Sequence, residues 1–392
     1  MPVKDIKYYT HSGHFYNERK ALKKKFALLL LIVLLLIGFG FGIPLFLRKW
    51  QAPLGPALGL PTATATQTVR PATETPPAMA SFGELGQTTS PSTSTATATS
   101  APLCGGPPLM YILAIGADSG QSYDYGLADA IRVVRIDFVT PKVTALTFPR
   151  DLWVEIPDIA TKYDITQGKL NQAYFYGGKG MGYYQGEGEG PGLLARTLQL
   201  NFGVQVDHYG AINMNTFVRL VNAVGGIDLY LPEAVDGTSE DPTTIDLGYF
   251  PGGQHHFTGE EALRFARIRK KYSDFARQDH QTMVLCALRA KLKEAGVYTR
   301  IPQIISAFQG SVQTDLSPQQ LAQLACLLPH LKRENILFAS FPAELLPPGR
   351  VYNPYYKKTT FAIQADHQAL RAYVEKFIAG TWPDQPEEPA CP

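Results

Sequence analysis

The stretch MYILAIGAD, residues 110–118, decides the fold class. Its first six residues are apolar and the run ends at Gly116, which is the pattern of a buried β-strand. Asp118 follows this strand directly, so its carboxylate is expected at the carboxyl end of the strand. In open α/β sheets, that edge is where ligands bind.

Strand-like and helix-like segments alternate outward from this stretch. The β-rich segments 131–138 and 142–148 are joined at Thr140 and Pro141, as in a hairpin, and the alternating segment 152–156 either extends that sheet or follows it. Further strands are expected at 208–212, 227–231 and 336–341, and helices at 192–202, 216–224, 259–266, 278–294, 317–328 and 365–378. This order predicts an α/β fold with helices on both sides of a sheet. We find neither a repeat nor a second core, so residues 108–381 are expected to form one domain, followed by a tail at 382–392.

An uncharged segment near the N-terminus predicts where the protein lies in the cell. Residues 26–47 contain no charged side chain, and about 22 helical residues span the ~30 Å hydrocarbon core of a bilayer. Five basic residues lie between positions 19 and 25, whereas only Arg48 and Lys49 closely follow the segment. This asymmetry predicts a cytoplasmic tail at 1–25, a single-pass membrane anchor at 26–47 and an extracytoplasmic remainder. A cleaved signal peptide is the alternative, but the apolar run is long for one.

Residues 48–107 are rich in Thr, Ser, Ala and Pro and carry few charges. Such a composition buries too little apolar surface to offset the entropy of ordering, so we expect a disordered linker or stalk. An extracytoplasmic location permits disulfides. Cys104 and Cys391 could join the two ends of the domain, because domain ends often lie close together. Cys286 and Cys326 lie in apolar helical patterns and are expected to be buried hydrophobic residues.

The overall composition excludes several classes of protein. The 392 residues carry a net charge of only +2, which argues against a nucleic-acid binder. The four cysteines do not have zinc-site spacing. Neither a Gly-x-Ser-x-Gly elbow nor a His-Glu-x-x-His motif occurs, so serine-hydrolase and zinc-protease functions lack support.

A basic cluster at residues 264–281 indicates an anionic ligand. It holds six basic side chains against two acids, and guanidinium groups bind phosphate oxygens in a bidentate way. Arg267 and Arg269 would point to the same side only in an extended segment, so the helix that begins at Gly259 is expected to end near Ala266. A solvated basic face is the alternative.

The residues that follow this segment are expected to begin another helix. Asp274 has the character of an N-cap, and Arg277 and Gln281 share one helical face. That face opens beside a helix N-terminus, which favours anions.

Two acids and one further arginine are expected at the same edge of the sheet. Asp118 and Asp129 lie at adjacent strand ends and could hold Mg²⁺, which prefers oxygen ligands and commonly bridges to substrate phosphates. For each acid the alternative is a turn or cap residue. Arg150 follows Pro149 at the end of another strand, and for it a surface pair with Asp151 is the alternative.

Seven motifs in this order resemble the LytR-CpsA-Psr family of membrane-anchored glycopolymer transferases. The resemblance covers the anchor, the stalk and most of residues 109–290. The motifs are Ile112-Leu-Ala-Ile-Gly-Ala-Asp118, Ala128-Asp129-Ala-Ile131, Thr147-Phe-Pro-Arg150-Asp151, Gly168-Lys169-Leu-Asn171-Gln-Ala173-Tyr, Leu220-Val-Asn-Ala-Val-Gly-Gly226-Ile-Asp228, Gly259-Glu-Glu-Ala-Leu263 with Ala266-Arg267-Ile-Arg269, and Asp274-Phe-Ala-Arg277 leading to Gln281.

The resemblance implies a three-layer α/β/α fold with a mixed central sheet and an apolar tunnel for a polyprenyl (pyro)phosphate lipid. It implies transfer of a glycan phosphate from that lipid to a hydroxyl of peptidoglycan or another wall acceptor. By position, Asp118 and Asp129 match the acids associated with Mg²⁺ or another divalent cation. The residues that match the pyrophosphate-binding and catalytic groups are Arg150, Lys169, Arg267, Arg269, Asp274, Arg277 and Gln281.

The chain departs from the family pattern at Leu127, where the family usually carries an arginine. Arg132 is a possible replacement, but the alternation of a regular strand places it opposite Asp129. The general base that would deprotonate the acceptor hydroxyl is left unassigned. Two alternatives to a transferase are therefore a non-catalytic polyprenyl-phosphate-binding or regulatory membrane protein and a hydrolase of the same lipid.

Overall fold

The computed structural model describes residues 43–58, 101–120, 122–269, 274–294 and 311–384, with the single residues 296, 300 and 303. They fall into two compact units. The smaller unit holds helix α2 (Ile43–Gln51) together with Ser317–Gln319, and the larger unit holds the rest. None of the helices in the described ranges is both long enough and apolar enough to cross a membrane. Most of the predicted anchor at 26–47 lies outside these ranges and stays a prediction.

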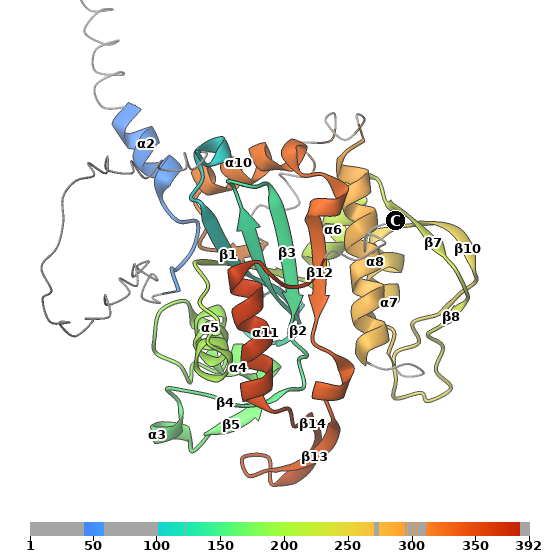
Figure 1. Cartoon of the computed structure of the whole chain (residues 1–392). Coiled ribbons are helices and arrows are strands. Elements are labelled where there is room, and N and C mark those ends of the chain that lie inside the picture. The colour runs from blue at the N-terminus through green and yellow to red at the C-terminus, as the bar shows by residue number, and fades with distance from the viewer. Residues whose placement is uncertain are drawn as a thin grey trace, which may run out of the picture. The chain divides into compact units, whose positions relative to one another are not determined.

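The larger unit is built on a six-stranded sheet (Figure 1). In spatial order its strands are β11 (Val312–Thr314), β6 (His208–Asn213), β1 (Leu109–Asp118), β2 (Leu127–Asp137), β3 (Lys142–Thr147) and β12 (Ile336–Ser340). β1–β2, β2–β3 and β11–β6 are antiparallel, whereas β1–β6 and β3–β12 are parallel. The prediction of a mixed central sheet is confirmed, including the hairpin between β2 and β3.

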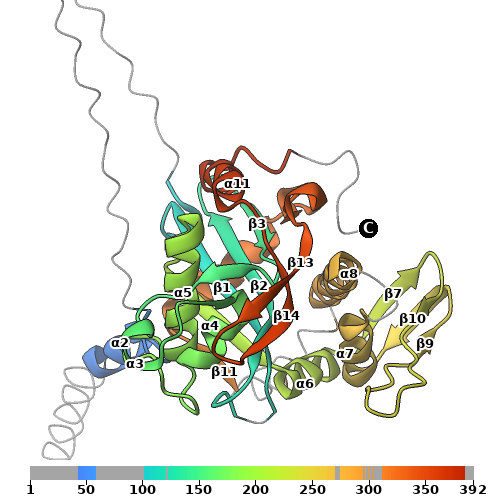
Figure 2. The same cartoon turned by 90° about the horizontal axis from the view of Figure 1, so that it is seen from below.

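Helices cover both faces of this sheet, and Figure 2 shows α11 and α6 on opposite sides of it. One layer contains α4 (Leu170–Gly177), α5 (Glu189–Phe202) and α11 (His367–Ala379). The other contains α6 (Met214–Val224), α7 (Gly259–Arg267) and α8 (Asp274–Leu292). The predicted three-layer arrangement is therefore present.

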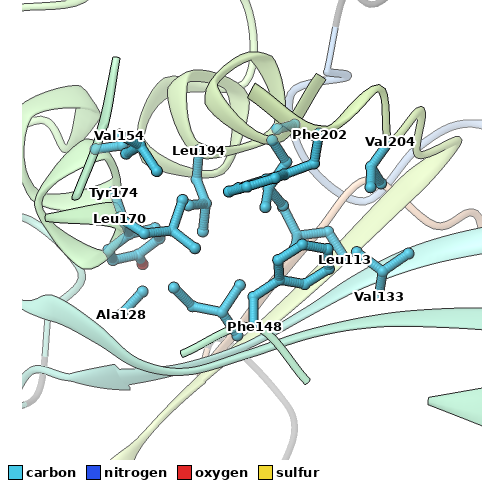
Figure 3. Close-up of a cluster of buried hydrophobic side chains, with 14 of the residues drawn as sticks. Leu113, Ala128, Val133, Phe148, Val154, Leu170, Tyr174, Leu194, Phe202 and Val204 are labelled. Atoms are coloured by element: carbon cyan, nitrogen blue, oxygen red, sulfur yellow. The ribbon is translucent and has the colours of Figure 1, made fainter. Parts of the chain in front are cut away.

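The main hydrophobic core fills the space between the sheet and the layer of α4, α5 and α11 (Figure 3). Leu113 and Leu194 are fully buried in it. The Phe148 ring lies 5.4 Å from the Phe202 ring and 5.3 Å from the Phe341 ring. Burial of each such side chain stabilises the fold by about 1.5–3 kcal/mol. This core holds the end of β3 in place, immediately before Pro149 and Arg150.

A second, smaller cluster, not expected from the sequence, packs within the same compact unit. The antiparallel pair β7 (Ile227–Leu231) and β10 (Gly253–Phe257) contributes to it together with α6, α7 and α8. β8 (Val235–Asp236) and β9 (Tyr249–Phe250) form a short ladder beside it. Gly225 ends α6 with φ 91°, a left-handed conformation that favours glycine, as its sequence signal predicts. This cluster fixes the positions of α7 and α8, which carry Arg264, Arg267 and Arg277 of the basic cluster.

One buried histidine in this cluster leads to a pH prediction. The His280 ring on α8 packs 4.7 Å from the Phe265 ring on α7. Burial lowers the pKa of His280, and a hydrogen bond to the Ile268 backbone and the charge of Asp279 act in the opposite direction.

A histidine in the unfolded chain has a pKa of about 6.5. Above that pH His280 is neutral in both the folded and the unfolded chain, and the folded state has its full stability. As the pH falls toward the lower pKa of the folded state, the unfolded chain binds the proton more readily, so the free energy of unfolding decreases. Urea unfolding at pH 7.5 and 5.5 should therefore show a smaller acid-induced loss of stability in His280→Gln than in the unchanged chain. An identical loss in both proteins would contradict this assignment.

The remaining elements surround the sheet. β4 (Trp153–Glu155) pairs with β5 (Gln167–Lys169) in a separate two-stranded sheet, so residues 152–156 follow the central sheet and do not extend it. The hairpin of β13 (Pro348–Asn353) and β14 (Lys358–Ile363) was not predicted. Short helices complete the fold, namely η2 (Leu103–Gly105), α3 (Ala160–Tyr163), α10 (Pro318–Leu327), η4 (Leu328–His330), η5 (Arg333–Asn335) and η6 (Ala343–Leu345).

Both ends of the predicted linker are ordered, which corrects the boundary at 48–107. Leu58 is buried in the main core, and the Leu54 amide donates to the Leu316 carbonyl at 3.3 Å. Near the other end, the Leu103 amide donates to the Phe138 carbonyl at 2.8 Å. Apolar residues at the two ends explain this packing. Residues 59–100 lie outside the described ranges.

The disulfide prediction is wrong. Cys104 is bonded to Cys326, with the two Cα atoms 5.9 Å apart. Cys326 is exposed on α10 and is therefore not the buried hydrophobic residue that its apolar neighbours predict. Cys286 is buried, as predicted, and is also disulfide-bonded. Cys391 lies outside the described residues.

Candidate functional site

A cavity of about 350 Å³ lies between the sheet face opposite the main core and the layer of α6, α7 and α8. Most of its lining is apolar and comes from β1, β6, β11 and the three helices. Six polar residues belong to the same lining: Asp118, Asp129, Arg132, Asn213, Arg267 and Gln281. An apolar chamber with a few convergent polar groups is the usual form of a small-molecule site.

Helical spacing brings α7 and α8 to this cavity. Leu263, Ala266 and Arg267 are three and four residues apart on α7, and all three line the cavity. Gln281, Val284 and Leu285 repeat that spacing on α8. Residues at such intervals share one helical face, so each helix presents apolar side chains and one polar group to the same space.

A β-bulge sets the position of Asp129. Ala117 on β1 pairs with Ala128, whereas the preceding Gly116 pairs with Ala130, so Asp129 is an extra residue in β2. A bulge shifts the alternation of side chains along its strand. Asp129 and Arg132 consequently line the same cavity. The prediction that they lie on opposite faces is wrong because it assumed a regular strand.

A chain of ion pairs connects Asp129 with Lys169. The Arg150 guanidinium binds the Asp129 carboxylate, and its Nε lies 3.5 Å from Asp151 Oδ2. Lys169 Nζ donates to Asp151 Oδ1 at 2.7 Å. Asp151 is only 5% exposed, so Arg150 does not form the surface pair considered above. Arg150 and Lys169 are not part of the cavity lining. These contacts connect them to Asp129, which lines the cavity.

Asp151 was not among the predicted site residues. Its adjacency to Arg150 was visible in the sequence, but its burial was not. The Asp151 carbonyl accepts from the Ile363 amide at 2.9 Å, so the unpredicted hairpin β13–β14 holds this segment.

The other predicted residues are not all brought together. Arg267 is the last residue of α7 and lines the cavity, whereas Ile268 is extended and Arg269 is exposed. Arg269 lines a neighbouring hollow of about 330 Å³, which Arg267 also borders. The helix thus ends at Arg267, one residue beyond the expected end near Ala266, and the two arginines share this hollow although only Arg267 also lines the cavity.

On α8, the predicted residues occupy different environments. Gln281 lines the cavity, whereas Arg277 is 4% exposed and is not part of the lining. Asp274 is the first residue of the helix, and its side chain lies outside the described part of the structure.

Asp118 and Asp129 offer carboxylate oxygens to a metal ion at the cavity. Asp118 ends β1 and is exposed. In the described part of the chain, the only cluster of three metal-ligating side chains is Cys104, Cys326 and His330, and its two sulfurs form the disulfide. Two acids without a third protein ligand suit Mg²⁺, which commonly binds through one or two carboxylates and its substrate's phosphates. Magnesium binding at these two residues stays a prediction.

Comparison with known proteins identifies relatives of this chain. TagV of Bacillus subtilis, named a polyisoprenyl-teichoic acid–peptidoglycan teichoic acid transferase, is 30% identical over 202 residues, which are 51% of this chain and 47% of that protein. The regulatory protein MsrR of Staphylococcus aureus strain COL is 27% identical over 214 residues, which are 54% of this chain and 58% of that protein. The chain therefore spans about half the length of these relatives.

The fold agrees with these matches. The crystal structure of Bacillus subtilis TagV aligns with a TM-score of 0.51 at 25% identity, and the alignment covers 69% of this chain and 97% of that chain. The model of the LytR_cpsA_psr family matches residues 106–373, which include the central sheet, both helical layers and the cavity. This chain belongs to the LytR_cpsA_psr family.

Proposed function

We propose that the protein is a membrane-anchored phosphotransferase. It moves a glycopolymer phosphate from a polyprenyl-pyrophosphate carrier to a hydroxyl of peptidoglycan in the cell wall. Family membership supports this proposal, as does the similarity to TagV, which is named a teichoic acid transferase. Residues 26–47 would anchor the chain, with the N-terminus in the cytoplasm and the domain outside. Such a tether raises the effective concentration of a membrane-bound donor.

One observation carries the proposal, namely that a single cavity joins an apolar lining to charged groups. An amphiphile with a long hydrocarbon chain and an anionic head matches both parts. The hydrocarbon would contact residues such as Phe217, Val284 and Leu285, and the head would meet Arg267 and Gln281. A soluble sugar phosphate would leave the apolar lining without a partner.

Arg150 and Lys169, the two cations of the ion-pair chain, are also proposed to bind the pyrophosphate head of the lipid. Without ligand, the Asp129 and Asp151 carboxylates neutralise these two cations. A bound pyrophosphate offers oxygens that compete for the same N–H donors. The bound Mg²⁺ that we propose at Asp118 and Asp129 would neutralise further charge on the phosphate oxygens.

In the proposed reaction, the acceptor hydroxyl oxygen forms a bond to the glycan-linked phosphorus. The bond between that phosphorus and the bridging oxygen breaks, and polyprenyl phosphate leaves with the electron pair. The hydroxyl proton is released to a base that is left unassigned. Such transfers require positioning and stabilisation of charge on oxygen rather than covalent chemistry by the protein. The basic groups Arg150, Lys169 and Arg267 supply that stabilisation.

A second candidate function is binding of the lipid without transfer. The similarity to MsrR, which is named a regulatory protein, favours this function. Leu127 also favours it, because an apolar residue there contributes no positive charge to the site. A third candidate is hydrolysis of the same pyrophosphate lipid.

One experiment separates the three functions. Purified full-length protein in detergent is offered a lipid-linked glycan and a peptidoglycan acceptor, with and without Mg²⁺. We expect Mg²⁺-dependent movement of the glycan to the acceptor. Retained lipid with no turnover would replace the transferase by a binding protein, and phosphoglycan released without acceptor would replace it by a hydrolase.

A further inference from the structure

Arg132 is buried more deeply than the other charged residues of the cavity lining. It is 5% exposed, whereas Asp129 and Arg267 are half-buried and Asp118 is exposed. Its position on the cavity face follows from the bulge at Asp129, three residues earlier on β2. A cationic side chain that is almost completely buried therefore belongs to the lining of the proposed lipid cavity.

Within the described ranges, the partners of Arg132 are neutral. Its Nη2 donates to Thr282 Oγ1 at 3.2 Å and lies 3.5 Å from the Gln278 carbonyl oxygen. Its guanidinium lies 5.4 Å from the centre of the Phe338 ring. Its Nη1 is buried and has no hydrogen-bond partner, and no carboxylate in the described ranges forms an ion pair with it. Burial lowers the pKa of Arg132 to about 10, so the side chain is still charged at neutral pH.

A buried charge without a counterion is unfavourable, and an apolar side chain of similar size would fill the same space at lower cost. The nearby Arg135 on the same strand is also buried, but its charge is paired with a carboxylate, as is usual for a buried arginine. Its Nη1 lies 3.5 Å from Asp137 Oδ2 and its Nε donates to the Ile378 carbonyl. Arg132 has the donor and the charge, but the described residues give it no anionic partner.

We propose that Arg132 is a further binding residue for the pyrophosphate head of the lipid donor. The guanidinium turns toward the cavity so that its Nη1–H donates to a phosphate oxygen, which supplies the counterion that the described residues do not. This inference rests on the proposed function, because that function places a lipid pyrophosphate in this cavity. It assigns to Arg132 a role in head-group recognition that is separate from any role in the fold.

The test compares Arg132→Met and Arg132→Lys with Arg135→Met as the matched control from the same strand. Full-length proteins in detergent are titrated by calorimetry with farnesyl diphosphate, farnesol and inorganic pyrophosphate. Arg132→Met should bind farnesyl diphosphate at least about tenfold more weakly, as expected for loss of a hydrogen bond to a charged group. Its affinity for farnesol should be unchanged. Arg132→Lys should retain part of the lost affinity because it keeps the charge.

Thermal unfolding without ligand provides a second readout. Arg132→Met should unfold at the same temperature as the unchanged chain or higher, because an unpaired buried charge is removed. Arg135→Met should unfold at a lower temperature, because it removes the ion pair with Asp137 and the hydrogen bond to the Ile378 carbonyl, yet it should bind farnesyl diphosphate normally. A structural role for Arg132 would instead give both arginine variants the same loss of stability.

Three results would overturn the inference. Farnesyl diphosphate affinity in Arg132→Met within twofold of the unchanged chain would remove Arg132 from the site while leaving the proposed function intact. Equal affinity of the unchanged chain for inorganic pyrophosphate and farnesyl diphosphate would exclude the lipid as the specific ligand. Failure of the unchanged chain to bind farnesyl diphosphate at all would overturn both the role of Arg132 and the proposed function.

Discussion

Replacing Arg267 with alanine is expected to slow glycan transfer by about a hundredfold to a thousandfold, the range seen when one charge-stabilising donor is removed from a transition state. Arg267 lies in the last turn of α7, lines the cavity and is half-buried. It forms no ion pair with any residue in the described ranges, so its removal breaks no such contact in the fold. The thermal midpoint should therefore change by only a few degrees.

Arg264→Ala is the matched control for this prediction. Arg264 lies one turn earlier on the same helix, is exposed, and has its guanidinium 6.0 Å from the Phe250 ring. Single-turnover transfer and thermal unfolding are measured for both variants, and Arg264→Ala should keep nearly full activity. Equal loss of activity in the two variants would show that only the summed positive charge of α7 matters, and that Arg267 has no specific role. A loss of activity in Arg267→Ala that follows its loss of stability would identify the residue as structural.

Signals that depend on neighbouring residues predicted much of the fold. The capping box of α7 is present, with the Thr258 amide donating to Glu261 Oε2 at 2.9 Å and the Glu261 amide donating to Thr258 Oγ1 at 3.3 Å. The strand at residues 110–115 is the centre of β1, and Gly225 ends α6. Each of these features arises within a few residues of sequence, where hydrogen bonding and backbone sterics are local.

Features that depend on pairing between distant segments were missed. The pairing of β1 with β2 shifts by one residue after Gly116, and this shift is the bulge at Asp129. Because of it, Asp129 and Arg132 line the same cavity. The burial of Asp151 depends on its partners Arg150 and Lys169 and on the hairpin β13–β14. The end of α7 was predicted to within one residue, but the sequence did not show that only Arg267 of the two neighbouring arginines would line the cavity. The candidate site could therefore be predicted as a list of residues, but not as a geometry.

Disulfide pairing is the clearest case of this limit. Four cysteines allow three pairings, and sequence alone does not choose between them. The choice of Cys104 with Cys391 followed from the tendency of domain ends to lie close together. In the structure, α10 packs beside η2 instead, and Gln323 Nε2 donates to the Gly105 carbonyl at 2.7 Å. Leu103, Leu324 and Leu327 belong to one hydrophobic cluster there. Apolar packing thus brings Cys326 to Cys104.

Removing this disulfide in the double variant Cys104→Ser with Cys326→Ser should lower the free energy of unfolding by about 2–4 kcal/mol. The two residues are 222 positions apart, so the bond restricts most of the domain in the unfolded chain. Neither residue lines the cavity, so the variant that remains folded should keep its transfer activity. Urea unfolding gives the free energy. A reducing agent is not an adequate substitute for the variant, because Cys286 is also disulfide-bonded.

Ala325→Ser is the matched control for the disulfide, since it places a hydroxyl at the neighbouring exposed position of α10. Its free energy of unfolding should stay within about 0.5 kcal/mol of the unchanged chain. If the double cysteine variant also stays within that range, the contacts of Leu103 and Gln323 hold η2 against α10 without help from the bond. If it loses activity while remaining fully folded, the link between η2 and α10 acts on the cavity through β1, because η2 lies directly before that strand.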